Sequence, residues 1–73
     1  MTLVERSYGD EYIVYFYWQI LDDQNNCVWE SDRRDREDDD FHDLVEEVKQ
    51  ACDDYGVDPV LRDDFVRRWG KYR

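Results

Sequence analysis

Residues 12–21 read YIVYFYWQIL, and this stretch decides the fold. It is rich in β-branched and aromatic side chains and contains no Gly or Pro, which predicts a β-strand. Alternate side chains of a strand point to opposite faces, so one face can be buried while the other meets solvent. The face that we predict to lie in the core carries Tyr12, Val14, Phe16, Trp18 and Ile20.

Shorter segments on either side of this stretch complete a sheet. Residues 2–7 can form a strand, with residues 8–11 as the turn that follows it. Residues 22–26 are a cluster of turn-forming Asp, Gln and Asn, and residues 27–31 then return as a third strand. We therefore expect an antiparallel meander, because three strands with one buried face can be stable where a lone hairpin is not.

The pattern changes at Phe41, where apolar residues begin to recur every three or four positions. This spacing predicts an amphipathic helix. Asp39 or Asp40 can cap its start, and Gly56 can end it in a left-handed conformation. The apolar positions of the repeat are Phe41, Leu44, Val45, Val48, Cys52 and Tyr55.

A second helix is predicted from Asp58, a favourable N-cap, and Pro59, which suits the first helical position. It is expected to run to about Trp69, with Leu61, Phe65 and Trp69 on its buried side. Residues 32–39 (DRRDREDD) contain no apolar residue and are expected to form a solvated connection. The sequence thus predicts one α+β domain over residues 1–73, in which a three-stranded antiparallel sheet is followed by two helices packed on one face.

The charge is distributed unevenly. The formal net charge is −10, and residues 35–64 contain thirteen carboxylates against Arg36, Lys49 and Arg62. The charges of the segments before and after this stretch cancel, because residues 65–73 are basic. Such density opposes the compact state through self-repulsion and favours a partner with a basic surface. It disfavours direct binding to nucleic acid or to an anionic membrane, because both need cations.

Catalysis has little support in the sequence. His42 is the single histidine, and no nucleophile motif or Gly-rich phosphate loop is present. The acids from Asp35 to Glu46 resemble the spacing of a calcium loop, but Asp40 stands where that loop needs glycine. We therefore expect a protein that is not an enzyme and that has no cofactor and no metal site.

Several features indicate a cytoplasmic location. Cys27 and Cys52 allow at most one bridge, whereas small secreted domains usually carry more, so we expect reduced thiols. The N-terminal residues do not follow the pattern of a signal peptide. The longest apolar run, residues 12–18, is too short to cross a bilayer.

The acidic face of the first helix, with its extensions, is the main candidate for partner binding. An ordinary solvated helix face would mix Lys with Glu, whereas Lys49 is the only cation between Glu37 and Arg62. A salt-loving source organism is an alternative reason for an acid-rich, lysine-poor surface. The candidate residues are Asp38, Asp39, Asp40, Asp43, Glu46, Glu47, Asp53, Asp54, Asp63 and Asp64.

The second candidate surface is the aromatic face of the central strand that points away from the helices. Large exposed apolar patches usually mark interfaces, and Tyr is a favoured anchor. Homodimerisation, contact with another protein and cover by a terminal segment all remain open for this face. Its residues are Ile13, Tyr15, Tyr17 and Leu21.

With its single small domain and its acids concentrated in residues 35–64, the chain resembles the small acidic inhibitors of phages and mobile elements, such as DNA-mimicking anti-CRISPR and anti-restriction proteins. The resemblance implies binding to the basic DNA-contacting surface of a host defence complex, a CRISPR effector for instance, and exclusion of DNA. The basic residues Arg67, Arg68, Lys71 and Arg73 depart from a pure mimic. Two alternatives are an immunity protein or antitoxin that neutralises a cationic nuclease, and a dimeric, non-enzymatic regulatory subunit.

Overall fold

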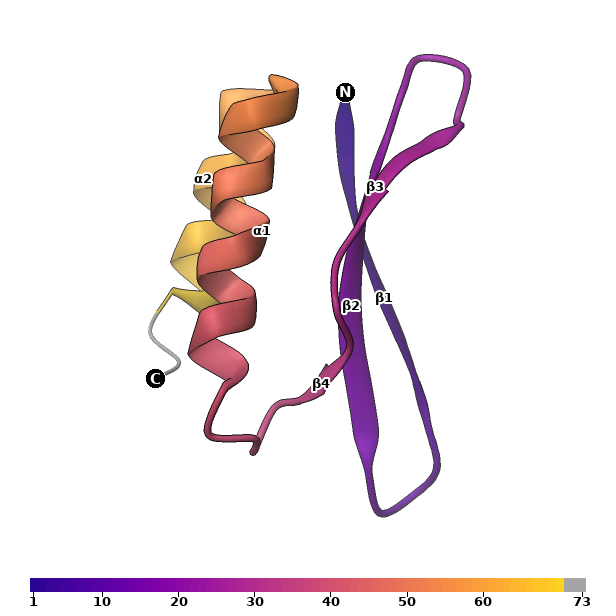
Figure 1. Cartoon of the computed structure of the whole chain (residues 1–73), viewed down its shortest axis with the longest axis vertical. Helices are drawn as coiled ribbons and strands as arrows, with labels where there is room; N and C mark the ends of the chain where they lie inside the picture. Colours follow the sequence, from indigo (N-terminus) through magenta and orange to yellow (C-terminus); the bar gives the residue numbers. More distant parts are fainter. Residues whose placement is uncertain (71–73) are drawn as a thin grey trace.

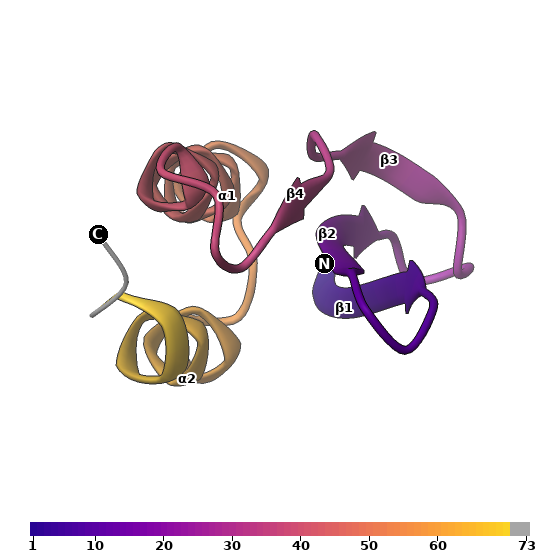
Figure 2. The same ribbon diagram turned by 90° about the horizontal axis from the view of Figure 1, so that it is seen from below.

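A computed structural model describes residues 1–70 and contains a sheet followed by two helices (Figure 1). Figure 2 shows both helices on the same side of the sheet. The predicted α+β fold is therefore confirmed. Its elements are β1 (Thr2–Gly9), β2 (Val14–Leu21), β3 (Cys27–Glu30), β4 (Arg34–Asp35), α1 (Phe41–Tyr55) and α2 (Pro59–Trp69).

Strand β2 is the centre of the sheet. It pairs along its whole length with β1, from Thr2 opposite Leu21 to Gly9 opposite Val14, and the pairing is antiparallel. Its other edge pairs with β3 and with the short β4, also antiparallel. The strand that the sequence identified as decisive thus contacts every other strand.

The side chains of β2 that face the helices form the middle of the core. Trp18 and Ile20 are fully buried, and Phe16 is half-buried. The ring of Trp18 lies against those of Phe65 and Trp69, with centroid distances of 5.2 and 5.4 Å. These contacts tie the sheet to α2, and the large area buried by each aromatic ring lets a short chain build a core.

The predicted core face was wrong at its first two positions. Tyr12 is 86% exposed and Val14 is 42% exposed, because the hairpin formed by β1 and β2 extends beyond the end of the helices that cover the rest of the sheet (Figure 1). Leu61 lies on the side of α2 that faces the sheet, as predicted, and lines a space there with Leu3 and Trp18, but it is 36% exposed rather than buried. Periodicity identifies a face, but it does not show how far the covering layer reaches.

The turn between β1 and β2 lies two residues later than predicted, because Asp10 fixes its position. The Asp10 carboxylate accepts hydrogen bonds from the backbone N–H groups of Tyr12 (2.8 Å) and Ile13 (3.0 Å). These bonds, that from Ile13 first, lower the pKa of Asp10. Gly9 has φ of +147°, which suits glycine, and β2 begins only at Val14.

The connection predicted to be solvated instead contains β4, which the sequence did not reveal. Arg34 lies opposite Phe16, and Asp35 lies opposite Tyr15. Ser31 holds the residues that precede β4 against β2. Its hydroxyl accepts a hydrogen bond from the backbone N–H of Trp18 at 2.9 Å and donates one to the carbonyl of Asp32. Two such bonds account for a buried polar side chain in an otherwise apolar core.

The helix ends follow the predicted signals closely. The Asp58 carboxylate accepts from the N–H of Val60 at 2.9 Å, with Pro59 in the first turn of α2. Gly56 ends α1 with φ of +69°. Asp40 is the N-cap of α1, but its side chain makes no capping bond. Within residues 1–70, neither helix has the length and apolar character that crossing a bilayer would require.

Candidate partner-binding surfaces

The acids of α1 point to solvent because its apolar residues form one stripe. Phe41, Leu44, Val45, Val48 and Cys52 are all buried against the sheet and α2. At 100° per residue, Asp43, Glu46 and Asp54 fall on the opposite side of the helix. Glu47 lies at the flank of this side. Amphipathic spacing therefore places these carboxylates in a row along the exposed side of α1.

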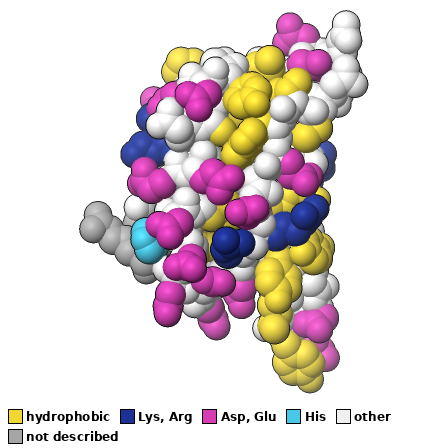
Figure 3. All heavy atoms as spheres, viewed as in Figure 1, with side chains coloured by type: hydrophobic (Ala, Val, Ile, Leu, Met, Phe, Trp, Pro, Cys, Tyr) yellow, Lys and Arg dark blue, Asp and Glu magenta, His cyan; other side chains and the backbone are white. Residues whose placement is uncertain are grey.

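The structure places all ten predicted acidic residues at the surface. Asp64 is half-buried and the other nine are exposed. Asp38, Asp39 and Asp40 lie in the segment that leads into α1, and Asp63 and Asp64 belong to α2. Figure 3 shows many acidic side chains over α1 and around its start, interrupted by few cations.

The part of the predicted surface nearest α2 is neutralised by arginines. The Nε atom of Arg62 lies 2.7 Å from Asp53, and a second nitrogen of the same guanidinium lies 3.6 Å from Asp63. Arg67 forms an ion pair with Asp64. Asp53, Asp63 and Asp64 therefore offer a partner much less net charge than the sequence suggested.

The acids at the start and along the exposed side of α1 keep most of their charge. Within residues 1–70, Glu46 pairs only with Lys49, at 3.7 Å, and Asp43 only with His42, at 3.1 Å, and His42 is a cation only when protonated. In the same part of the chain, no cation lies within ion-pair distance of the remaining exposed acids, which are Asp38, Asp39, Asp40, Glu47 and Asp54. We define the helix acidic surface as Asp38, Asp39, Asp40, Asp43, Glu46, Glu47 and Asp54.

Glu47 differs from its neighbours because it lies beside the connection between β3 and β4. Partial burial raises the pKa of Glu47, and the charge of Asp32 raises it further, while Arg34 acts in the opposite direction. The charged form of Glu47 is thus less favourable in the folded protein than in the unfolded chain. Its carboxylate strengthens the negative surface at some expense of stability.

We expect Glu47→Gln to increase the free energy of unfolding at pH 7. The pKa of Glu47 is higher in the folded state, so its charge opposes folding at pH values above that pKa. At about pH 3.5 the carboxyl is largely protonated in both states, and the advantage of the variant should shrink. Urea denaturation at the two pH values measures this difference. Glu46→Gln is the matched control, and an equal gain from it would contradict the explanation.

The predicted aromatic face is only partly open. Ile13 and Tyr15 are exposed to 43% and 36%, whereas Tyr17 and Leu21 are half-buried. Ile13 belongs to the turn rather than to β2. The helices leave this face of the sheet uncovered (Figure 2), so the partial burial of Tyr17 has another cause.

An arginine covers the middle of the aromatic face. The guanidinium of Arg33 lies 4.6 Å from the ring centroid of Tyr17 and 5.9 Å from that of Tyr8, which is a cation–π arrangement. Tyr8 also stacks on Tyr15 at 5.5 Å. Sequence reasoning missed Tyr8 and Arg33. Tyr8 lies opposite Tyr15 in the pairing of β1 with β2, so a correct placement of the turn would have identified Tyr8 as part of this face.

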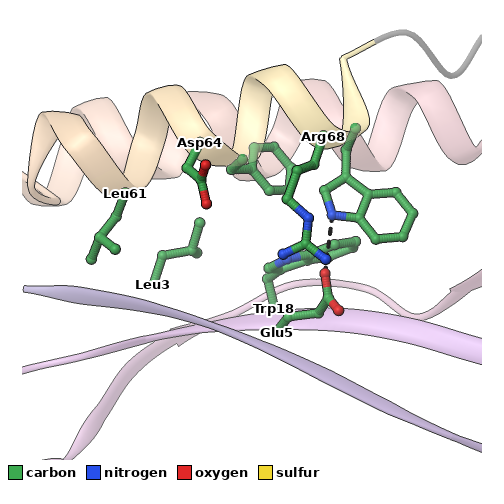
Figure 4. Close-up of a pocket in the computed structure, with 8 residues that line it drawn as sticks. Leu3, Glu5, Trp18, Leu61, Asp64 and Arg68 are labelled. Atoms are coloured by element: carbon green, nitrogen blue, oxygen red, sulfur yellow. Dashed lines mark hydrogen bonds between the residues drawn. The ribbon is translucent and has the colours of Figure 1, made fainter.

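A small pocket of about 140 Å³ lies between β1 and α2. Figure 4 shows Glu5 from the strand and Arg68 from the helix pointing into the same space. The indole N–H of Trp69 donates to Glu5 at 3.0 Å. Because the space is small and is lined by charged and aromatic side chains that already contact one another, we interpret the pocket as a gap in packing at the edge of the sheet.

Comparisons with protein-family models, curated proteins and solved structures found no match to this chain. Within the described residues, no group of three or more His, Cys, Asp or Glu side chains is arranged to hold a metal ion. Of the predicted basic residues, Arg67 and Arg68 lie in the last turn of α2. Lys71 and Arg73 fall outside the described residues.

Proposed function

We propose that this protein is a small, non-enzymatic inhibitor that binds the basic nucleic-acid-binding surface of a host defence complex and blocks access of DNA. The complex in this proposal is a CRISPR effector in the cytoplasm of the host bacterial cell. The helix acidic surface takes the place of the DNA backbone, and neither a cofactor nor direct contact with nucleic acid is needed. One observation carries the proposal: within residues 1–70, the carboxylates along α1 and at its start are largely without cationic partners.

The spacing of these carboxylates supports the proposal. Residues four apart on a helix are separated by about 6 Å along its axis, and Asp43 and Glu47 have this spacing. A DNA strand carries one phosphate charge about every 3.4 Å of its axis. The axial spacing of the charges on α1 is therefore less than twice that on a DNA strand. A groove of Arg and Lys that accepts phosphates would meet a similar row of negative charge. Attraction of this kind speeds association and weakens as salt increases.

The uneven distribution of charge over the surface argues against adaptation to a salty environment as the reason for the acidity. On the uncovered face of the sheet, Arg6 donates to Gln19 at 3.2 Å, and Gln19 donates to Glu30 at 2.7 Å. Glu30 also pairs with Arg33 at 3.5 Å. This face is close to neutral, whereas the helix acidic surface is not, and adaptation to salt alone would give no reason for the difference.

The test is competition for labelled target DNA on purified CRISPR effector complexes, with a type I surveillance complex among them. We expect the wild-type protein to displace DNA from one of these complexes, and less effectively as salt increases. Asp43→Lys/Asp54→Lys should weaken displacement roughly 100-fold, because each reversal replaces an attraction with a repulsion. Displacement that is insensitive to this change would overturn the proposal.

A matched variant separates local charge from total charge. Asp23→Lys/Glu30→Lys changes the net charge equally but alters two exposed acids in β3 and in the turn that precedes it. It should displace DNA nearly as well as the wild-type protein. A cationic nuclease belongs in the same assay, since inhibition of the nuclease alone would favour the immunity-protein alternative.

A further inference from the structure

The end of the β1–β2 hairpin exposes a cluster of large apolar side chains. The hairpin tip, as we define it, consists of Tyr8, Tyr12, Ile13, Val14 and Tyr15, with exposed fractions from 36% to 86%. Figure 1 shows this end of the hairpin extending past the start of α1, where neither α1 nor α2 covers either face. In Figure 3 the hydrophobic side chains at this end form a continuous area. Clusters of this kind usually mark interaction sites.

The tip is fixed in shape, although it is exposed. Asp10 accepts two backbone hydrogen bonds from the turn, and its own N–H donates to the carbonyl of Ile13 at 3.0 Å. Tyr8 stacks on Tyr15 across the two strands. A rigid loop loses little conformational freedom on binding, so its apolar contacts contribute more fully to affinity.

The tip is continuous with the acidic segment that leads into α1. Tyr15 lies opposite Asp35 of β4, and the chain runs from there through Asp38, Asp39 and Asp40 to the helix. Figure 1 places the turn and the start of α1 at the same end of the molecule. A partner that contacts the start of the helix acidic surface would therefore lie close to the tip.

Charge decides which occupant suits the tip. A second copy of this chain would bring another formal charge of −10 and would place Asp10 and Glu11 of the two copies near each other. Repulsion between like charges disfavours such a dimer. A partner with basic residues around an apolar cleft would satisfy both the acids and the exposed rings.

We propose that the hairpin tip inserts Tyr12 and Ile13 into an apolar cleft beside the basic surface that the helix acidic surface binds. This inference rests on the proposed function and adds to it a division of roles. The carboxylates steer association and determine its dependence on salt, while the tip holds the complex together once it has formed. Tyr is among the residues that most often dominate the energetics of an interface.

The test measures association and dissociation rates on the effector complex from which the wild-type protein displaces DNA. We expect Tyr12→Ala/Ile13→Ala to dissociate roughly 30-fold faster or more, with association changed only a few-fold and the salt dependence retained. Asp43→Lys/Asp54→Lys should instead slow association and reduce the salt dependence. Tyr55→Ala and Val60→Ala, which alter exposed apolar residues outside the tip, should bind like the wild type.

The outcomes distinguish this inference from the proposed function. If the tip variant dissociates like the wild type while the charge variant loses binding, the tip proposal is overturned and the proposed function stands. If the wild-type protein binds none of the complexes, both are overturned. A dimer in sedimentation experiments that is lost in Tyr12→Ala would show that a second copy occupies the tip, which also overturns the proposal.

Discussion

Trp18→Ala is expected to leave most of the protein unfolded at 25 °C. Trp18 is 1% exposed, and its ring contacts those of Phe41, Phe65 and Trp69, so the substitution removes the side chain that joins the sheet to both helices. Truncation of a buried Trp costs about 3–5 kcal/mol. A core of this size rarely supplies more than about 3–5 kcal/mol in total, so little stability would remain.

Near-UV circular dichroism and urea denaturation measure this effect. Tyr12→Ala is the control, because it removes an aromatic ring from the same hairpin at a position that is 86% exposed, and it should unfold at nearly the wild-type urea concentration. Trp18→Phe should recover part of the loss, since it keeps a ring in the site. A cooperative Trp18→Ala protein with the wild-type midpoint would show that the core does not depend on this residue.

Gly9→Ala is expected to have the second largest effect. A Cβ atom at position 9 would lie 2.1 Å from the carbonyl oxygen of Ile13 and 2.9 Å from the Cα of Val14, so backbone rather than a flexible side chain would have to move. Its φ of +147° is also unfavourable for alanine. We expect a loss of roughly 3 kcal/mol, the upper end of the range for local backbone strain.

Gly56→Ala provides the comparison for this prediction. Gly56 also has positive φ, at +69°, but a Cβ there would meet no atom of the described residues within 4 Å. It should lose only about 1–2 kcal/mol, the cost of the left-handed conformation alone. Urea midpoints for the two variants test the difference. NMR spectra of the backbone amides should show that Gly9→Ala disturbs the turn at residues 10–13. Equal losses would mean that the close approach at Gly9 is relieved without cost.

The sequence predicted the elements well where local chemistry specifies them. Asp58 and Pro59 begin α2, Gly56 ends α1, and the aromatic run forms the central strand. It failed where the outcome depends on distant parts of the chain. Ser31 bonds the backbone of Trp18 and so brings the two residues of β4 alongside β2, and no local pattern encodes that contact.

For the candidate surfaces too, local sequence patterns predicted part of the outcome, and contacts with distant parts of the chain decided the rest. Helical periodicity correctly predicted that the acids of α1 would be exposed, but it could not show that Arg62 would reach Asp53 or that Arg67 would pair with Asp64. On the sheet, alternation identified the outward tyrosines. It gave no sign that Arg33 would cover Tyr17, or that the helices would stop short of Tyr12.

The hydrogen bond between Trp69 and Glu5, together with the packing of Trp69 on Trp18, also has a consequence for synthesis on the ribosome. At roughly 5–20 residues per second, the 51 residues from Trp18 to Trp69 take about 3–10 s to translate. During that interval, and until α2 has left the ribosome, the hairpin lacks the helix that completes its cover, and exposed aromatic strands of this kind aggregate readily.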